Sequence, residues 1–305
     1  MTAHGAGQRP GSGVPAHDVE VTDALVRTLL FEQHPGLAGL DLVRVANGWD
    51  NIVYRLGGEL AVRLPRRASA HQLLLNEVRW LPFLAPRLPL PIPAVVRRGR
   101  PGSGYPYHWA VVPWFDGESA ANRPAADRDG YAAALGRFLR TLHVPAPADA
   151  PRNAVRGTAL ATRAEAFTRR LAEAGRPLPG PWHEIFANGV QAPEHHGPPL
   201  WLHGDLHPHN LVTVPGSGPA TISAVVDFGD LTAGDPACDL AAAWLHFTPA
   251  GRAAFIAELP HDADTWARAR GWAVHFGTLM ALMPEGDPLH SVGRHALGQL
   301  AVECV

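Results

Sequence analysis

The sequence contains no lysine, so that all 26 of its Lys+Arg residues are arginines. This absence excludes any mechanism that needs a Schiff-base, carbamate or P-loop lysine, and it makes every fixed cation a guanidinium. The 28 acidic residues bring the formal net charge to −2, whereas a dedicated nucleic-acid-binding protein would be strongly basic. We therefore expect no nucleic-acid partner.

Cysteine and long apolar runs are also scarce. Cys238 and Cys304 are too few for a disulfide framework, and we expect two free thiols in a reducing compartment. The best apolar run, Trp272–Met283, is shorter than the roughly 18 residues of a membrane span. Residues 1–17 lack the apolar run of a signal peptide and have the composition of a flexible tail. The sequence thus predicts a cytoplasmic protein without a membrane partner.

What is present is an ordinary globular composition, with 46% hydrophobic and 18% charged residues. At 305 residues the chain is long enough for about two core-bearing domains. Apolar periodicity predicts the following elements in the first part of the chain: a helix over Thr22–Gln33, three antiparallel strands over Leu40–Val45, Asn51–Leu56 and Leu60–Leu64, a helix over Gln72–Leu84 and a strand over Tyr105–Val112.

After Gly117 the pattern becomes mainly helical. The expected helices are Asp129–His143, Ala159–Ala174, Asp239–Phe247, Pro249–Leu259 and Asp264–Leu282, and the expected strand-and-loop pieces are Trp201–Leu211 and Ile222–Phe228. We therefore expect an α+β fold with a small N-terminal antiparallel sheet in residues 18–112, a connection at 113–117, and a larger helical part over 118–305.

The densest polar cluster is the segment His203–Asn210, with the sequence HGDLHPHN. Two chemistries fit it. Its alternating histidines and Asp205 would put four metal ligands on one face of a strand, as in a zinc hydrolase. Alternatively, the spacing His-x-Asp-x-x-x-x-Asn matches a phosphoryl-transfer loop, in which the aspartate receives a hydroxyl proton and the asparagine binds Mg²⁺.

The next element favours phosphoryl transfer. An apolar run ends in Asp227-Phe228-Gly229, seventeen residues beyond Asn210. A Gly- and Pro-rich turn at 215–219 separates the two segments, so we expect a hairpin that holds Asp205, Asn210 and Asp227 together. Three oxygen-bearing side chains suit Mg²⁺ better than Zn²⁺.

These residues resemble the aminoglycoside phosphotransferase family, the small-molecule branch of the protein-kinase-like fold. The family's His-Gly-Asp-x-His-x-x-Asn loop is similar to His203–Asn210, and its Asp-Phe/Trp-Gly element to Asp227–Gly229. Its following Gly-Asp-Pro-x-x-Asp-Leu-Ala resembles Gly234–Ala241. The resemblance implies a two-lobe kinase-like fold, which is consistent with the α+β pattern, and covers roughly residues 18–247.

The resemblance also implies roles for single residues. Asp205 would be the catalytic base or the group that orients the acceptor hydroxyl, and Asn210 and Asp227 would hold Mg²⁺ across the nucleotide phosphates. His203 would brace the loop. Asp239 resembles the family's buried aspartate that bonds back to the catalytic loop, so we expect it to be structural.

On the nucleotide side, the resemblance implies contacts from Asn51, which ends a loop that begins at Gly48. Arg63 stands where kinases place a lysine, with Glu77 as its helix partner. A guanidinium can fork onto phosphate oxygens, so this replacement is compatible with activity. The carbonyl of Pro113 and the N–H of Phe115 would bind the edge of the purine.

We therefore expect a Mg²⁺-dependent enzyme that transfers the γ-phosphoryl group of ATP or GTP to a hydroxyl of a small-molecule antibiotic, an aminoglycoside first, conferring resistance or self-protection. Six acidic residues after Leu240 outnumber four arginines, which mildly favours a polycationic substrate. Three tryptophans in the same region, Trp244, Trp266 and Trp272, would suit a macrolide instead. A choline- or homoserine-kinase-like metabolic enzyme and a non-catalytic pseudokinase remain as alternatives.

Overall fold

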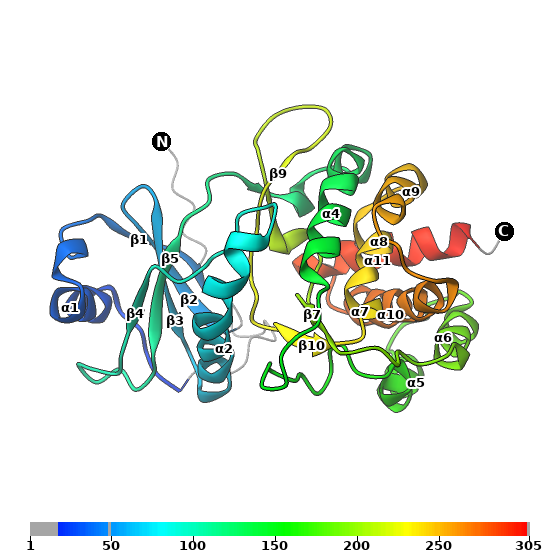
Figure 1. Ribbon diagram of the computed structural model, residues 1–305, viewed down its shortest axis with the longest axis horizontal. Helices are drawn as coiled ribbons and strands as arrows, with labels where there is room; N and C mark the ends of the chain where they lie inside the picture. The colour runs from blue at the N-terminus through cyan, green and yellow to red at the C-terminus, as the bar shows by residue number, and fades with distance from the viewer. Residues whose placement is uncertain (1–17, 48–49, 304–305) are drawn as a thin grey trace. The chain divides into compact units, whose positions relative to one another are not determined.

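The computed structural model describes residues 18–47 and 50–303 (Figure 1). The expected tail, the Gly48–Trp49 part of the expected nucleotide loop and Cys304 therefore lie outside the described residues. The chain forms two compact units, one made of residues up to Leu75 with Val96–Pro113, the other of Asn76–Val95 with the residues from Trp114 onward. The division falls inside helix α2 (Ala68–Leu84), which the sequence predicts only from Gln72.

The first unit contains a five-stranded antiparallel sheet in the order β1-β2-β3-β5-β4. Its strands are β1 (Leu42–Asn47), β2 (Asn51–Leu56), β3 (Leu60–Pro65), β4 (Arg97–Gly99) and β5 (Trp109–Pro113). In the β2–β3 hairpin Leu56 pairs with Leu60. Gly57 begins that turn with a φ of +61°, which a residue without a side chain adopts at little cost. The predicted three-stranded meander is therefore confirmed.

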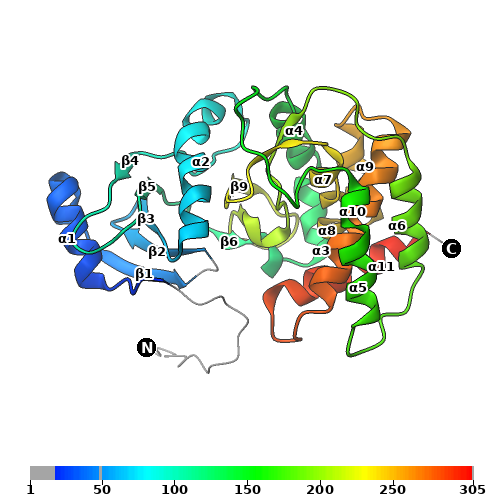
Figure 2. The same cartoon turned by 90° about the horizontal axis from the view of Figure 1, so that it is seen from below.

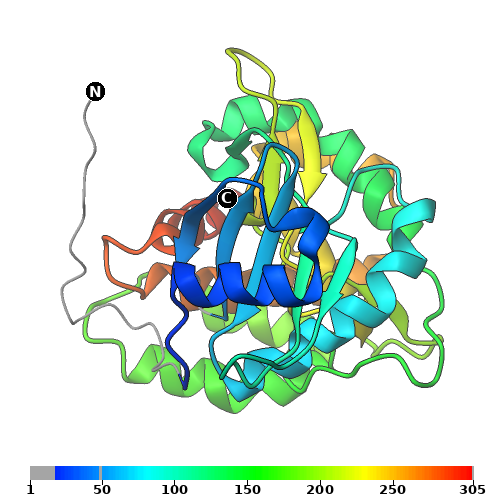
Figure 3. The same ribbon diagram turned by 90° about the vertical axis from the view of Figure 1, so that its left-hand side faces the viewer.

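Helix α1 (Asp23–Gln33) packs on one face of this sheet, as Figure 3 shows. The Thr22 hydroxyl caps the helix by accepting the N–H of Leu25. Leu29 and other apolar side chains of the helix join the strands in one buried core. A short 3-10 turn, η1 (Pro35–Leu37), leads from the helix to the sheet.

The predicted strand over Tyr105–Val112 is wrong in its first half. Gly102 and Tyr105 exchange backbone hydrogen bonds across a tight turn, and the Tyr105 hydroxyl donates to the carbonyl of Pro65. These bonds hold the backbone out of the ladder until Trp109. An aromatic, apolar run thus marks burial here without marking a strand.

The second unit is mainly helical (Figures 1 and 2). Its helices are α3 (Ala125–Arg128), α4 (Ala132–Leu142), α5 (Ala164–Ala172), α6 (Trp182–Gln191), α7 (Ala237–Leu240), α8 (Ala242–His246), α9 (Pro249–Ala257), α10 (Ala263–Ala281) and α11 (Pro288–Val302). Helix α10 packs against both α6 and α11, two helices that the sequence pattern does not predict. Short 3-10 turns are η2 (Ala85–Arg87), η3 (Ala120–Asn122), η4 (Asp129–Tyr131), η5 (Leu160–Arg163) and η6 (Pro208–Asn210).

Two small antiparallel sheets complete the second unit. Strand β7 (Leu200–Leu202) pairs with β10 (Thr232–Gly234). Strand β8 (Leu211–Thr213) pairs with β6 (Glu118–Ser119) on one side and with β9 (Ile222–Val225) on the other. The predicted hairpin between the two polar segments is thereby confirmed.

Among the described residues, no helix is both long and apolar enough to cross a lipid bilayer. The thiol of Cys238 is buried and unbridged.

Candidate active site

The loop His203–Asn210 begins at the end of β7 and leads into β8, so each small sheet fixes one end of it. Gly204 makes this geometry possible, because its φ is +86° and a Cβ there would lie 2.3 Å from the carbonyl oxygen of Asp230. Any side chain at this position would displace one of the two segments. The loop and the segment after Asp227 are therefore in direct backbone contact.

Asp239, in α7, supports the loop from inside the unit. Its carboxylate accepts the backbone N–H of His203 at 2.7 Å and that of Gly204 at 2.8 Å, and His143 Nε2 lies 3.3 Å from the same group. The residue is buried, and hydrogen bonds to a buried carboxylate are stronger than neutral ones. Asp239 is thus bonded back to the loop, as the resemblance implies.

His203 braces the loop by using both ring nitrogens. Nδ1 accepts the backbone N–H of Asp205 at 3.3 Å, so the proton lies on Nε2, which donates to the carbonyl of Val226 at 3.0 Å. The ring also packs on Phe228, with 4.5 Å between centroids. These contacts tie the loop to the residues on either side of Asp227.

The Asp205 carboxylate lies among donors on both of its oxygens. Arg156 Nη2 donates to Oδ1 at 3.2 Å, while His207 Nε2 lies 3.2 Å and Asn210 Nδ2 3.4 Å from Oδ2. Burial by itself raises the pKa of Asp205, but His207 and Arg156 outweigh it and hold that pKa well below its usual range. About a quarter of the side chain remains exposed, so the ionised group is accessible to an acceptor.

Asn210 and Asp227 lie at the two ends of the β8–β9 hairpin. Asn210 Nδ2 donates to the backbone carbonyl of Asp205 at 2.8 Å, which turns the amide oxygen toward the opposite side. The backbone N–H of Val226 donates to the carbonyl of Asn210 at 2.9 Å and so joins the two ends. Asp227 is exposed and has a φ of +62°, a left-handed conformation that is uncommon for residues other than glycine.

The four-ligand metal arrangement is not formed. His203 and His209 direct their Nε2 atoms to the carbonyls of Val226 and Pro288, away from one another. Within residues 18–47 and 50–303, no three histidine, cysteine or carboxylate side chains cluster as a metal site would require. The amide oxygen of Asn210 and the carboxylate of Asp227 are instead oxygen donors of the kind that would suit a hard cation.

The residues expected on the nucleotide side lie in both units. Asn51 opens β2, and its Oδ1 is a buried oxygen for which the described part of the chain offers no hydrogen-bond donor. Arg63 is buried on β3, opposite Val53 in the ladder. Glu77 is buried in α2. Pro113 ends β5 and is paired with Leu60, and Phe115 is half-buried two residues later.

Sequence reasoning misses Arg156 and Asp230 as site residues. Arg156 lies in an irregular segment before η5, and in a chain whose cations are all arginines nothing distinguishes it from the other 25. Asp230 follows Asp227-Phe228-Gly229 directly, so its position in the sequence was the one available signal. Burial raises the pKa of Asp230, and the Arg156 guanidinium opposes that shift.

The side chains that suggested a substrate class are largely used inside the protein. Glu258 pairs with Arg137 and Arg140. Glu303 pairs with Arg252 and Arg270 and accepts the indole N–H of Trp244. Of the other acids, Asp262 and Asp287 cap helices and Glu285 pairs with Arg176. Trp244 and Trp272 are buried in the core of the second unit. Asp264 and Glu285 nevertheless remain exposed and Trp266 is half-buried, so part of each set is still open to a ligand.

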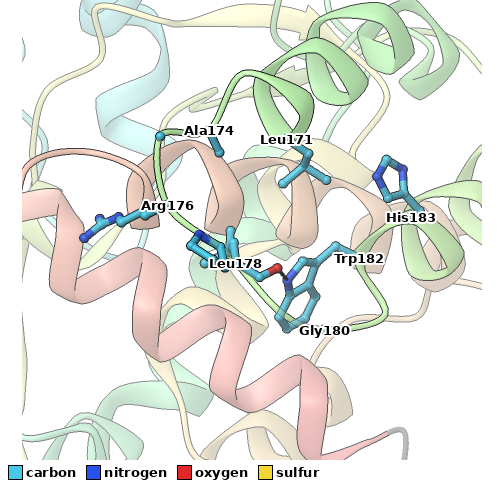
Figure 4. A pocket seen from close by; sticks show the side chains of 9 residues that line it. Leu171, Ala174, Arg176, Leu178, Gly180, Trp182 and His183 are labelled. Carbon is cyan, nitrogen blue, oxygen red and sulfur yellow. Dashed lines mark hydrogen bonds between the residues drawn. The ribbon is translucent and has the colours of Figure 1, made fainter.

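A cavity of about 390 Å³ lies in the second unit at the connection between α5 and α6 (Figure 4). Leu171, Leu178 and Trp182 line it, and the Trp182 indole donates to the carbonyl of Leu178 at 3.0 Å. Arg176 directs its guanidinium to the carbonyls of Ala281 and Met283. None of the lining residues belongs to the loop of Asp205.

An antiparallel sheet unit, a mainly helical unit, and a loop–hairpin pair carrying Asp205, Asn210 and Asp227 together define the protein-kinase-like fold. The chain belongs to the phosphotransferase enzyme family, whose model matches residues 41–272. The expected family resemblance and the α+β fold class are thereby confirmed.

Solved structures show the same fold. The GDP complex of wild-type aminoglycoside 2′-phosphotransferase-IIIa is 18% identical with a TM-score of 0.67, over 93% of this chain and 100% of that one. The GDP and kanamycin complex of APH(2″)-IIia is 19% identical with a TM-score of 0.66, over 92% of this chain and 99% of that one. The macrolide 2′-phosphotransferase MphH of Brachybacterium faecium is 21% identical with a TM-score of 0.56, over 90% of this chain and 97% of that one. No curated protein sequence matches the chain significantly.

Proposed function

We propose that the protein is a cytoplasmic kinase that transfers the γ-phosphoryl group of ATP or GTP to a hydroxyl of a small-molecule antibiotic, an aminoglycoside first, in resistance or self-protection. The observation that carries this proposal is the loop of Asp205, held by Asp239 and His203 with its carboxylate ionised and partly open. Family membership and structural neighbours in GDP complexes, one of them also with kanamycin, support it.

In the proposed step, the acceptor hydroxyl oxygen forms a bond to the γ-phosphorus while the bond from that phosphorus to the bridging oxygen breaks. The nucleoside diphosphate leaves with the electron pair, and the hydroxyl proton passes to Asp205 and then to solvent. Because Asp205 is a weak base, it first orients the hydroxyl and takes the proton late, when the new bond has made that proton acidic.

The oxygen donors Asn210 Oδ1 and the Asp227 carboxylate fit Mg²⁺ and would hold it. When bound, Mg²⁺ neutralises charge on the nucleotide phosphates. We assign Arg63, with Glu77 as its partner, to the same phosphates, and Asn51 to the nucleotide through its buried Oδ1. The Pro113 carbonyl and the Phe115 N–H would bind the purine edge.

A macrolide acceptor is the second candidate. Glu258, Glu285 and Glu303 are paired with arginines, which reduces the negative charge available to a polycation. A macrolide 2′-phosphotransferase also shares the fold. The test must therefore offer both classes of acceptor.

The experiment is a mass-spectrometric screen for phosphorylated product. Wild type and Asp205→Ala each receive Mg-ATP or Mg-GTP with kanamycin, gentamicin, streptomycin, a panel of macrolides, choline and homoserine. We expect one antibiotic to gain a phosphoryl group with wild type alone, because Asp205→Ala removes the group that orients the hydroxyl. Phosphorylation of choline or homoserine instead would make this a metabolic kinase. Nucleotide binding without any product would indicate a pseudokinase.

A further inference from the structure

The segment Pro151–Gly157 lies along β10, beside the candidate site. The backbone N–H of Ala233 donates to the carbonyl of Pro151, and the N–H of Asp235 donates to that of Gly157, both at 2.9 Å. Thr232 adds a side-chain contact by accepting the N–H of Asn153 at 2.9 Å. The segment is thus fixed to the strand at both of its ends.

Arg156 is the residue that this segment brings to Asp205. Its Nη2 donates to Asp205 Oδ1 at 3.2 Å, and its Nε lies 3.6 Å from Asp230 Oδ2. The guanidinium also lies over the ring of Phe276 in α10, 4.8 Å from its centroid. Only 16% of the side chain is exposed. A planar cation held between two acids and a ring has little freedom to turn.

The arrangement places two carboxylates on one cation. Asp230 is itself fixed from the same segment, because Asn153 Nδ2 donates to its Oδ1 at 2.7 Å. With Arg156 removed, Asp205 would keep its Oδ2 contacts to His207 and Asn210 but would lose the cation at Oδ1 that it shares with Asp230. Like charges at such range repel strongly, so Asp205 would turn away from the position that the acceptor hydroxyl requires.

We propose that Arg156 is a positioning residue for phosphoryl transfer: it fixes the Asp205 carboxylate toward the acceptor by neutralising the repulsion from Asp230. The inference rests on the proposed function, since it concerns the aim of Asp205 in that reaction. It assigns Arg156 no contact with the nucleotide. Its signature is therefore a loss in kcat with little change in the KM for nucleotide.

The test compares Arg156→Ala with Arg152→Ala in the full chain, using the acceptor and nucleotide that wild type uses best. Arg152 is a matched control on the same segment, because its guanidinium donates to the backbone carbonyl of Ala233 and to no carboxylate described here. We expect kcat of Arg156→Ala to fall about 10–100-fold, as for misplacement of a catalytic group by about 1 Å. Arg152→Ala should keep a kcat close to that of wild type.

Two rescue experiments separate an effect on the orientation of the Asp205 carboxylate from an effect on folding. Millimolar guanidinium chloride should restore part of the kcat of Arg156→Ala by filling the vacated cation position, and Arg156→Lys should lie between the alanine variant and wild type. Asp230→Asn in the Arg156→Ala background should raise kcat again, because it removes the repelling charge. The melting temperature of each variant is measured alongside.

Equal kcat losses in Arg156→Ala and Arg152→Ala would overturn the inference, and so would a loss that neither guanidinium nor Asp230→Asn relieves. A wild type that phosphorylates no acceptor of the panel with either nucleotide would overturn the proposed function, and the role of Arg156 with it. The wild-type measurement distinguishes the two failures, because only failure of the proposed function leaves wild type without a product.

Discussion

Gly204 is the residue at which local backbone conformation and the candidate chemistry meet. Its positive φ turns the chain so that the N–H groups of His203 and Gly204 point to Asp239 while Asp205 faces outward. The same turn brings the loop against the carbonyl of Asp230. A single residue without a side chain therefore sets the distance between the two acidic segments.

Gly204→Ala should abolish most transfer activity and lower stability by about 1–3 kcal/mol, the cost of a strained left-handed residue, before the clash with Asp230 is added. Gly216→Ala is the matched control, since no atom lies within 4 Å of the Cβ it would introduce. Activity and melting temperature of both variants provide the measurement. Wild-type activity in Gly204→Ala would contradict the close approach.

At the scale of elements, one buried ion pair joins β10, α6 and α10. Arg268, in α10, donates through Nε to Asp235 Oδ2 at 2.7 Å and through Nη2 to Oδ1 at 3.2 Å. Its Nη1 donates to the carbonyl of Pro193, just beyond α6. Asp235 also accepts the N–H of Ala237 at the start of α7. Both side chains are buried, so each depends on the other for its charge.

Arg268→Ala should lower the free energy of unfolding by about 3–5 kcal/mol, because it leaves an uncompensated buried carboxylate. Arg294→Ala, an exposed position on α11, should change it by less than about 0.5 kcal/mol. Urea unfolding of the two variants and wild type measures both values. A loss for Arg268→Ala no greater than for Arg294→Ala would show that Asp235 finds another partner.

Helices α6 and α11 show why part of the element pattern could not be predicted. Gly189 in α6 lies against Gly271 in α10, where a Cβ would be 2.9 Å from the facing Cα. Gly293 in α11 lies against the Ala281 backbone, where a Cβ would be 2.2 Å from its nitrogen. Glycine weakens helix propensity, so the residues that allow close packing also weaken the sequence signal for the helix.

At the scale of the whole molecule, four histidines link stability to pH: His246 and His275 are buried, and His261 and His295 are half-buried. Burial lowers the pKa of His275 to about 3 and of His261 and His295 to about 4, and it lowers that of His246 well below its ordinary value. The unfolded chain binds protons on these rings from about pH 6.5 downward, whereas in the folded chain the rings stay neutral until the pH approaches their lowered pKa values. Their contribution to stability is therefore complete above pH 6.5 and is lost as pH falls toward 4.

We expect the free energy of unfolding to fall steeply between pH 6.5 and about 4. His275→Gln should make that slope shallower, because the unfolded variant takes up one proton fewer in this window. His183→Gln, at an exposed site on α6, serves as the control and should leave the slope close to that of wild type. Urea unfolding at a series of pH values tests this, and identical slopes in wild type and His275→Gln would contradict it.

The sequence carries more information about the candidate catalytic loop His203–Asn210 than about its surroundings. Asp239 is bonded to the loop as the family resemblance implies, and the hairpin joining Asn210 to Asp227 forms as the Gly- and Pro-rich turn predicts. Arg156 could not be found in this way, because its role depends on how Pro151–Gly157 crosses β10. Short-range patterns fix turns and strands, while a contact over 49 residues depends on the packing of the whole unit.

The sharing of Arg156 by two acids also has a consequence for how such a chain can change over generations. Loss of Arg156 leaves both carboxylates opposed, whereas loss of the charge on Asp230 leaves Arg156 fully paired with Asp205. On the proposed role of Arg156, a lineage that replaces Asp230 first and the arginine afterwards keeps its activity, whereas the reverse order passes through an impaired enzyme. The geometry therefore favours one order of substitution at the two positions.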